Sequence, residues 1–139
     1  MDAHLCCIRP LFADTDAAGV VYYATFLRYL EEARTQAVES VGVSMAAEVA
    51  AGALYPVTHV SIDYQSPAVY GRAVCIATEV TEIGRARFRL DHRVFDVGGG
   101  QALARATVWL ACIDAQTRRP RRLPPTMAAA LVALRAGDG

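Results

Sequence analysis

Residues 12–34 read FADTDAAGVVYYATFLRYLEEAR and carry the strongest structural pattern of the chain. This run begins as a turn with two Asp residues and a Gly, and it passes into a segment with helical periodicity at residues 24–41. Apolar side chains recur there every three or four positions, at Phe26, Leu30, Ala33, Ala37 and Val41. This spacing is typical of a helix that buries one face, and Gly42 provides a stop. We therefore predict one long helix over residues 24–41.

Apolar or alternating segments on both sides of this helix predict five strands. They span residues 4–12, 60–64, 73–83, 85–94 and 102–113. Alternation is clearest in 85–94, which predicts one dry and one charged face. The strands after the helix are joined by short connections, so antiparallel pairing in hairpin succession is expected. Residues 44–52 predict a short helical segment, and Pro124 and Pro125 open a short C-terminal helix.

This order of elements predicts an α+β domain. One helix with an apolar stripe covers one face of an antiparallel sheet, so we expect a curved five-stranded sheet wrapped around one long central helix. With 139 residues, 54% of them hydrophobic, the chain is expected to form a single domain over residues 1–139. One helix leaves apolar sheet edges and faces uncovered, which favours a homo-oligomer, either a dimer or a tetramer.

The composition disfavours several classes of protein. The 14 basic residues, all Arg, balance 14 acidic ones, so a nucleic-acid-binding protein is not expected. Arg suits phosphate because its rigid fork donates two parallel hydrogen bonds. No segment reaches the roughly 18 apolar residues that a membrane helix needs. The N-terminal residues lack the basic character of a signal peptide, so we expect a cytoplasmic protein without a membrane span.

The cysteines give no sign of a metal site. Cys6, Cys7, Cys75 and Cys112 form no CxxC pair and have no ligand-like spacing to His. We therefore expect buried thiols in a reducing compartment.

The turn before the long helix carries the groups with the most chemical interest, Asp14, Asp16 and Gly19. A helix N-terminus offers unpaired N–H groups and the positive end of its dipole. A thioester hydrolase needs a carboxylate that attacks the carbonyl carbon or activates water, and N–H donors for the oxygen that becomes negative. A loop that enters a helix can supply both.

Structural roles stay open for the same residues. Asp14 is interpreted as a turn or cap residue, and capping is an alternative role for Asp16. The pattern Asp-x-Asp-x-x-Gly also opens a calcium loop. Such a loop needs an oxygen ligand and a Glu where this chain has Ala18 and Thr25, so no metal is expected.

The run from Phe12 to Arg34 resembles the signature of hotdog-fold thioesterases, in the branch of 4-hydroxybenzoyl-CoA thioesterase and the Tol-Pal-associated acyl-CoA thioesterases. The resemblance continues through PVTHVSIDYQSP at 56–67, CID at 112–114 and RPRRLP at 119–124, and so covers nearly the whole chain. The segment at 56–67 and the ending are similar to 1,4-dihydroxy-2-naphthoyl-CoA hydrolases of quinone synthesis. The resemblance implies a hotdog fold and hydrolysis of an acyl- or aryl-CoA thioester without a cofactor.

The resemblance also implies roles for single residues of the motif. Asp16 corresponds to the family's catalytic carboxylate, which acts as nucleophile or general base. The backbone N–H of Tyr23 corresponds to the donor that polarises the thioester carbonyl. Tol-Pal-associated members usually carry His at this position, so Tyr23 favours an aromatic acyl group. Gly19 and Tyr22 are expected to contact the substrate, and Phe26 and Tyr64 are further candidates for an acyl pocket, with plain core packing as the alternative.

Basic residues near the hairpin after the third strand hold coenzyme A phosphates in the family. Arg85 and Arg87 occupy that place here. A second cluster contains Arg118, Arg119, Arg121 and Arg122, for which a solvated connection is an equal alternative. His59 is expected to contact a hydroxyl group on an aromatic substrate, or else to be a hydrogen-bonded residue on a sheet face. Glu31 is either a carboxylate facing the site or the surface partner of Arg34.

Three other functions are alternatives to an aryl-CoA thioesterase. A thioesterase for short or medium aliphatic chains differs only in its pocket. An enoyl-CoA hydratase or dehydratase needs an Asp/His pair, and the motif around Asp16 contains no His. A non-catalytic acyl-CoA-binding protein of the same fold would bind coenzyme A without turnover.

Overall fold

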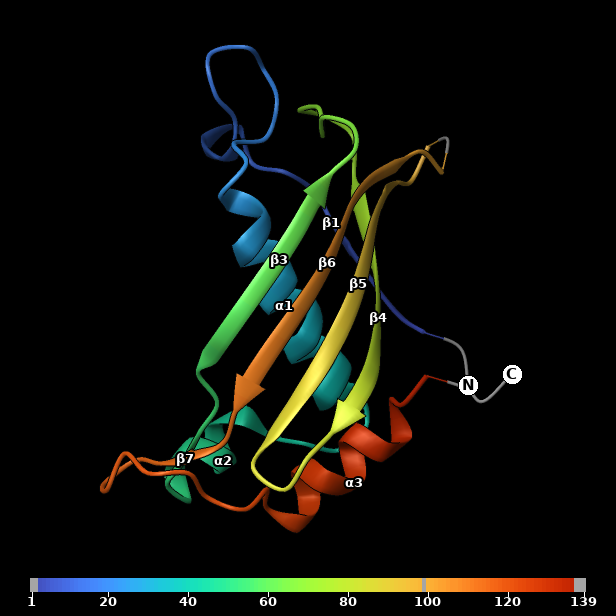
Figure 1. Cartoon of the computed structure of the whole chain (residues 1–139). Helices are drawn as coiled ribbons and strands as arrows, with labels where there is room; N and C mark the ends of the chain where they lie inside the picture. Colours follow the sequence, from blue (N-terminus) through green and yellow to red (C-terminus); the bar gives the residue numbers. More distant parts are fainter. Residues whose placement is uncertain (1–2, 99, 137–139) are drawn as a thin grey trace.

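The computed structural model describes residues 3–98 and 100–136. The elements are β1 (His4–Ile8), a 3-10 turn η1 (Phe12–Asp14), α1 (Thr25–Ser40), α2 (Met45–Ala50), β2 (Ala53–Leu54), β3 (Val57–Tyr64), β4 (Val74–Ile83), β5 (Arg87–Asp96), β6 (Ala102–Ala111), β7 (Ile113–Asp114) and α3 (Pro125–Ala133). The main sheet has five antiparallel strands in the order β1-β4-β5-β6-β3. Figure 1 shows this twisted sheet curving around α1. The predicted α+β class is confirmed.

The central helix buries the face that its periodicity predicted. Phe26, Leu30, Ala33 and Ala37 are all buried against the sheet. Ala33 and Ala37 are fully buried, and their small side chains let the helix axis lie close to the strands. α1 therefore ends up inside the curve of the sheet, with its N-terminus next to the loop that carries Asp16 (Figure 1).

One strand pairing differs from the expected hairpin succession. β3 does not pair with β4, which follows it in the chain, but with β6, with Tyr64 opposite Ala104 and Val60 opposite Val108. The chain leaves β3 at Tyr64, passes over the end of the sheet and enters β4 beside β1 (Figure 1). β3 thereby becomes one of the two edge strands of the sheet.

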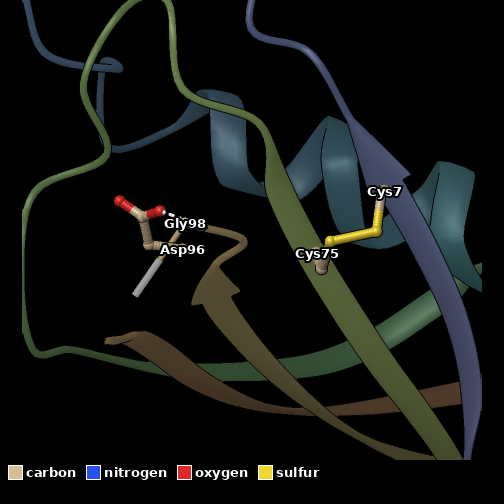
Figure 2. Close-up of a disulfide and its surroundings, with 4 residues drawn as sticks. All are labelled: Cys7, Cys75, Asp96 and Gly98. Carbon is tan, nitrogen blue, oxygen red and sulfur yellow. Dashed lines mark hydrogen bonds between the residues drawn. A yellow bond between two sulfur atoms is a disulfide. The ribbon is translucent and has the colours of Figure 1, made fainter. Parts of the chain in front are cut away.

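The expectation of four reduced cysteines is wrong for two of them. Cys7 and Cys75 form a disulfide between β1 and β4, shown in Figure 2. The two residues are direct register partners, although 68 positions separate them in the sequence. No local spacing marks such a pair, because strand register brings the residues together. Cys6 and Cys112 are buried free thiols, as expected.

A buried histidine interrupts the apolar face of β5. His92 is 1% exposed, and its Nδ1 lies 2.9 Å from Oγ1 of Thr78. Its Nε2 has no hydrogen-bond partner within the part of the chain that the structure describes. Burial, together with the positive charge of Arg34, lowers the pKa of His92 to about 3. The ring is therefore neutral in the folded protein and becomes protonated readily only after unfolding.

We expect this histidine to make the protein less stable in acid. Between pH 6 and pH 4 the unfolded chain binds a proton that folded His92 excludes, so the free energy of unfolding should fall by about 1.4 kcal/mol per pH unit from this group. Urea unfolding at several pH values measures the slope. The variant His92→Gln should lose that part of the slope, whereas His59→Gln, at an exposed position, should keep it. Equal slopes in wild type and His92→Gln would contradict the prediction.

No helix among residues 3–98 and 100–136 is both long and apolar enough to cross a membrane. The same residues contain no group of three or more His, Cys, Asp or Glu side chains placed to hold a metal ion.

Candidate functional site

Residues 15–21 form a tight loop that presents Asp16. Thr15 and Val21 form an antiparallel bridge at its base. The Asp16 N–H donates to the Val20 carbonyl at 2.9 Å, and the Gly19 N–H donates to the Asp16 carbonyl at 3.0 Å. Gly19 has φ +79°, a left-handed conformation that a residue with a Cβ rarely adopts. Gly19 thus shapes the turn through its backbone.

The Asp16 carboxylate lies at the surface and borders a cleft. Its Oδ1 accepts a hydrogen bond from the Ala18 N–H at 2.8 Å. Its Oδ2 has no hydrogen-bond partner within residues 3–98 and 100–136. The cleft has a volume of about 440 Å³, and Tyr22, Tyr23 and Tyr64 are among its lining residues. One oxygen therefore holds the side chain in place while the other is available to a ligand.

The two residues before α1, Tyr23 and Ala24, leave backbone donors at the start of the helix, and Tyr23 lines this cleft. The N–H groups of Thr25 and Phe26 donate to the carbonyls of Tyr22 and Tyr23. Those of Tyr23 and Ala24 have no acceptor in the described structure. The first N–H groups of a helix characteristically lack internal partners, and no side chain caps this helix. The Tyr23 donor was predicted; the Ala24 donor was not, because the start of the helix had to be known first.

Aromatic side chains form the wall of the cleft. The ring of Tyr64, on β3, lies edge-on to Phe26 at 5.3 Å and to Tyr23 at 6.3 Å. The Tyr64 hydroxyl donates to the Tyr23 carbonyl at 2.7 Å. Tyr22 and Tyr23 stack at an angle with centroids 4.7 Å apart. The four aromatic residues named from the sequence therefore meet at one place, and Tyr64 ties the edge strand to the start of α1.

Asp14 lies behind the loop and not in the cleft. It is 8% exposed, and its carboxylate accepts hydrogen bonds from Leu11, Arg28 and Tyr29. Burial alone would raise the pKa of Asp14, but these three donors outweigh it and hold the pKa below its ordinary value. Burial and the Asp14 carboxylate together raise the pKa of the Tyr29 hydroxyl. Asp14 is therefore a buried carboxylate that bonds to α1 as well as to the turn, whereas the sequence predicted a turn or cap residue only.

The other predicted binding residues lie at the opposite end of the subunit. His59 is on the outer face of β3 opposite Trp109. Arg85 is in the turn between β4 and β5, and the Arg87 guanidinium lies 4.8 Å from the Trp109 ring centroid. This turn is beside α3, whereas the Asp16 loop is at the far end of α1 (Figure 1). One chain alone does not bring these residues together with Asp16.

The remaining candidates are also away from the Asp16 loop. Glu31 contacts Arg34 at 3.4 Å and is 69% exposed, which matches the surface pair. The second Arg cluster lies between β7 and α3, where Arg121 Nη1 donates to the Ala51 carbonyl at 3.1 Å. The Leu123 N–H donates to the Arg85 carbonyl. Both groups of Arg residues therefore lie at the same end of the subunit.

Known proteins resemble this chain over most of its length. A 1,4-dihydroxy-2-naphthoyl-CoA hydrolase from Synechococcus elongatus is 36% identical over 115 residues, which is 81% of this chain and 83% of the relative. The acyl-CoA thioester hydrolase YbgC from Escherichia coli O6:H1 is 30% identical over 122 residues, 88% of this chain and 90% of the relative.

The fold gives the same assignment. The crystal structure of Slr0204, a 1,4-dihydroxy-2-naphthoyl-CoA thioesterase from Synechocystis, superposes with a TM-score of 0.87 at 30% identity, covering 94% of this chain and 96% of that one. The family model of the thioesterase-like superfamily matches residues 10–131. This match agrees with two features of the structure: the curved antiparallel sheet around one helix, and the loop carboxylate at the N-terminus of that helix. The chain belongs to the thioesterase-like superfamily of hotdog-fold proteins.

Proposed function

We propose that this protein hydrolyses the thioester of an aromatic acyl group and coenzyme A, with Asp16 as the catalytic carboxylate. One observation carries the proposal. The free oxygen of Asp16 borders the same cleft as Tyr23, whose N–H, like that of Ala24, is unpaired. A carboxylate and preorganised donors are the two parts that thioester cleavage needs.

The chemistry follows from these groups. The Tyr23 and Ala24 N–H groups hold the carbonyl oxygen as it becomes negative. In the nucleophilic form, an Asp16 oxygen bonds to the carbonyl carbon, the C–S bond breaks, coenzyme A leaves as its thiolate, and water hydrolyses the acyl-aspartyl anhydride. In the general-base form, Asp16 takes a proton from the water that attacks the same carbon, the C–S bond then breaks, and coenzyme A leaves as its thiol after taking up that proton. Losing one such N–H donor costs about 3 kcal/mol of barrier in related chemistry.

We propose further that the complete site is shared between two copies of the chain. β3 pairs only with β6 in the described sheet, so its other edge is open. Val57, Val60 and Tyr64 on this strand are 43%, 37% and 45% exposed. An open edge strand is a template for pairing. Antiparallel β3–β3 pairing around a two-fold axis would place the Arg-rich end of one subunit beside the Asp16 loop of the other. The oligomer would then be a dimer or a pair of dimers.

The aromatic acyl group is proposed on three grounds. First, the cleft is lined by the aromatic side chains of Tyr22, Tyr23, Phe26 and Tyr64. Second, this chain has Tyr23 where Tol-Pal-associated thioesterases usually carry His. Third, the 36% identical relative and Slr0204 are both named as enzymes for 1,4-dihydroxy-2-naphthoyl-CoA. The alternative, an aliphatic acyl-CoA thioesterase, is supported by the 30% identity to YbgC. A cytoplasmic location is proposed on the substrate class alone, since the Cys7–Cys75 disulfide does not favour a reducing compartment.

A substrate panel tests the proposal. Release of free thiol is measured with benzoyl-, 4-hydroxybenzoyl-, 1,4-dihydroxy-2-naphthoyl-, hexanoyl- and palmitoyl-CoA. We expect kcat/KM to be about tenfold or more higher for the aryl thioesters, because each unfilled contact in an apolar pocket costs about 1–3 kcal/mol. A preference for palmitoyl-CoA would overturn the aromatic assignment. Saturable binding of every thioester without thiol release would instead indicate a non-catalytic binding protein.

A further inference from the structure

The buried carboxylate next to the catalytic loop has no role in the chemistry above. Asp14 is two residues before Asp16, yet its side chain points into the protein and is 8% exposed. Its Oδ2 accepts hydrogen bonds from the Leu11 N–H at 2.9 Å and the Tyr29 hydroxyl at 2.7 Å. Its Oδ1 accepts one from Nη2 of Arg28 at 2.6 Å. A buried carboxylate is tolerated only when its oxygens are satisfied in this way.

These contacts join three parts of the site. Leu11 precedes the loop, and Arg28 and Tyr29 belong to α1, which begins directly after the unpaired donors of Tyr23 and Ala24. The Asp14 backbone is also engaged, since its carbonyl accepts the Tyr22 N–H at 2.9 Å. Asp14 therefore connects the start of the loop, the end of the loop and the helix.

We propose that Asp14 is a positioning residue that sets the distance between the Asp16 carboxylate and the N–H groups of Tyr23 and Ala24. The inference rests on the proposed function of Asp16. The loop has few other ties to α1: the bridge between Thr15 and Val21 closes the loop on itself, and the Val21 N–H bonds to Ala68, on the connection between β3 and β4.

The two side-chain partners on α1 contribute unequally. Arg28 is 52% exposed, so water and salt screen its ion pair with Asp14. The Tyr29 side chain is fully buried, and its hydroxyl has no competing water. The hydrogen bond from Tyr29 is therefore the part of the anchor that most restricts movement between loop and helix.

A positioning role and a purely stabilising role predict different kinetics. A stabilising contact changes the melting temperature and the amount of folded enzyme. A contact that aligns reacting groups changes kcat while KM stays constant, because the substrate still binds but the carboxylate is misplaced. Displacing a catalytic group by about 1 Å can cost about a hundredfold in rate.

The test compares Tyr29→Phe with the control Thr78→Val. Thr78 is also buried, with its Oγ1 2.9 Å from Nδ1 of His92, but it is in the middle of β4, remote from both the Asp16 loop and the β3 edge. Each variant loses one buried hydrogen bond, so both melting temperatures should fall. We expect Tyr29→Phe to lower kcat by about tenfold with KM within about twofold of wild type, and Thr78→Val to leave both unchanged.

Asp14→Asn removes the negative charge that accepts the hydrogen bonds of Arg28 and Tyr29, and it should lower kcat more than Tyr29→Phe does. Its folding is checked by circular dichroism, and Tyr29→Phe carries the test if Asp14→Asn does not fold. Equal kcat values for Tyr29→Phe and Thr78→Val, with wild type active and Asp16→Asn inactive, would overturn the positioning role and leave the proposed function standing. If wild type hydrolyses no thioester of the panel, the proposed function fails and this inference with it.

Discussion

Replacing Asp16 by Asn should lower kcat for thioester hydrolysis by about a thousandfold, which lies within the range for loss of a positioned acid–base or nucleophilic group. Asn keeps the shape of the side chain and the oxygen that accepts the Ala18 N–H at 2.8 Å, so the loop should keep its conformation. It loses the charge that attacks the carbonyl carbon or takes a proton from water. KM should change little, because the N–H groups of Tyr23 and Ala24 remain.

The measurement is thiol release under saturating substrate, followed together with the melting temperature. Glu39→Gln is the matched control, because Glu39 is an exposed carboxylate in the last turn of α1, away from the cleft. The control should keep the wild-type kcat. If Asp16→Asn is folded and retains more than about a tenth of wild-type kcat, the carboxylate is not the group that cleaves the thioester.

Removing both Arg85 and Arg87 should raise KM for the coenzyme A thioester by about a hundredfold, since each charge-assisted hydrogen bond contributes about 1.5–3 kcal/mol. The double variant Arg85→Gln/Arg87→Gln should keep its kcat, because the proposed contacts of both residues are with the nucleotide phosphates and not with the thioester carbonyl. The corresponding pantetheine thioester, which lacks the nucleotide phosphates, should show no change in KM. Arg93→Gln/Arg105→Gln is the matched control: both residues are exposed on the outer face of β5 and β6 and pair in register.

A mixing experiment tests whether the site is shared. Asp16→Asn chains and Arg85→Gln/Arg87→Gln chains are each inactive at low substrate concentration. If Asp16 of one subunit works with the Arg residues of its partner, random mixing gives half mixed dimers, each with one intact site. Activity should then recover to about a quarter of wild type for a two-fold symmetric dimer. Recovery no greater than the sum of the separate variants would show that Asp16 and the Arg pair do not act across a subunit interface.

The helix and most of the strands follow from local sequence patterns. The predicted helix at 24–41 is observed as Thr25–Ser40, because helical periodicity is a property of neighbouring residues. The same applies to the Asp16 loop: a carboxylate and a Gly just before a helix predict a charged group near free N–H donors. Family resemblance, and not spacing, selected Asp16 over Asp14 for catalysis. The structure adds the reason that Asp14 is unsuited to it, namely that three donors already occupy its oxygens.

Contacts between distant segments could not be predicted in this way. The β3–β6 pairing and the Cys7–Cys75 disulfide depend on strand order and register. Alternation over residues 85–94 places His92 on the dry face of its strand, but nothing in the sequence shows that the ring is kept neutral there. The hydrogen bond from Tyr29 to Asp14 joins residues of two elements whose relative orientation is set by core packing.

Local patterns in the sequence are enough to predict the class of fold, the long helix and the loop that presents a carboxylate at its start, because each depends on residues within a few positions of one another. Packing of distant segments makes β3 an edge strand, puts the Arg residues at the end of the subunit remote from Asp16, and buries Asp14 behind the loop. These features depend on how the sheet closes around α1, and burial and register across many residues determine that closure.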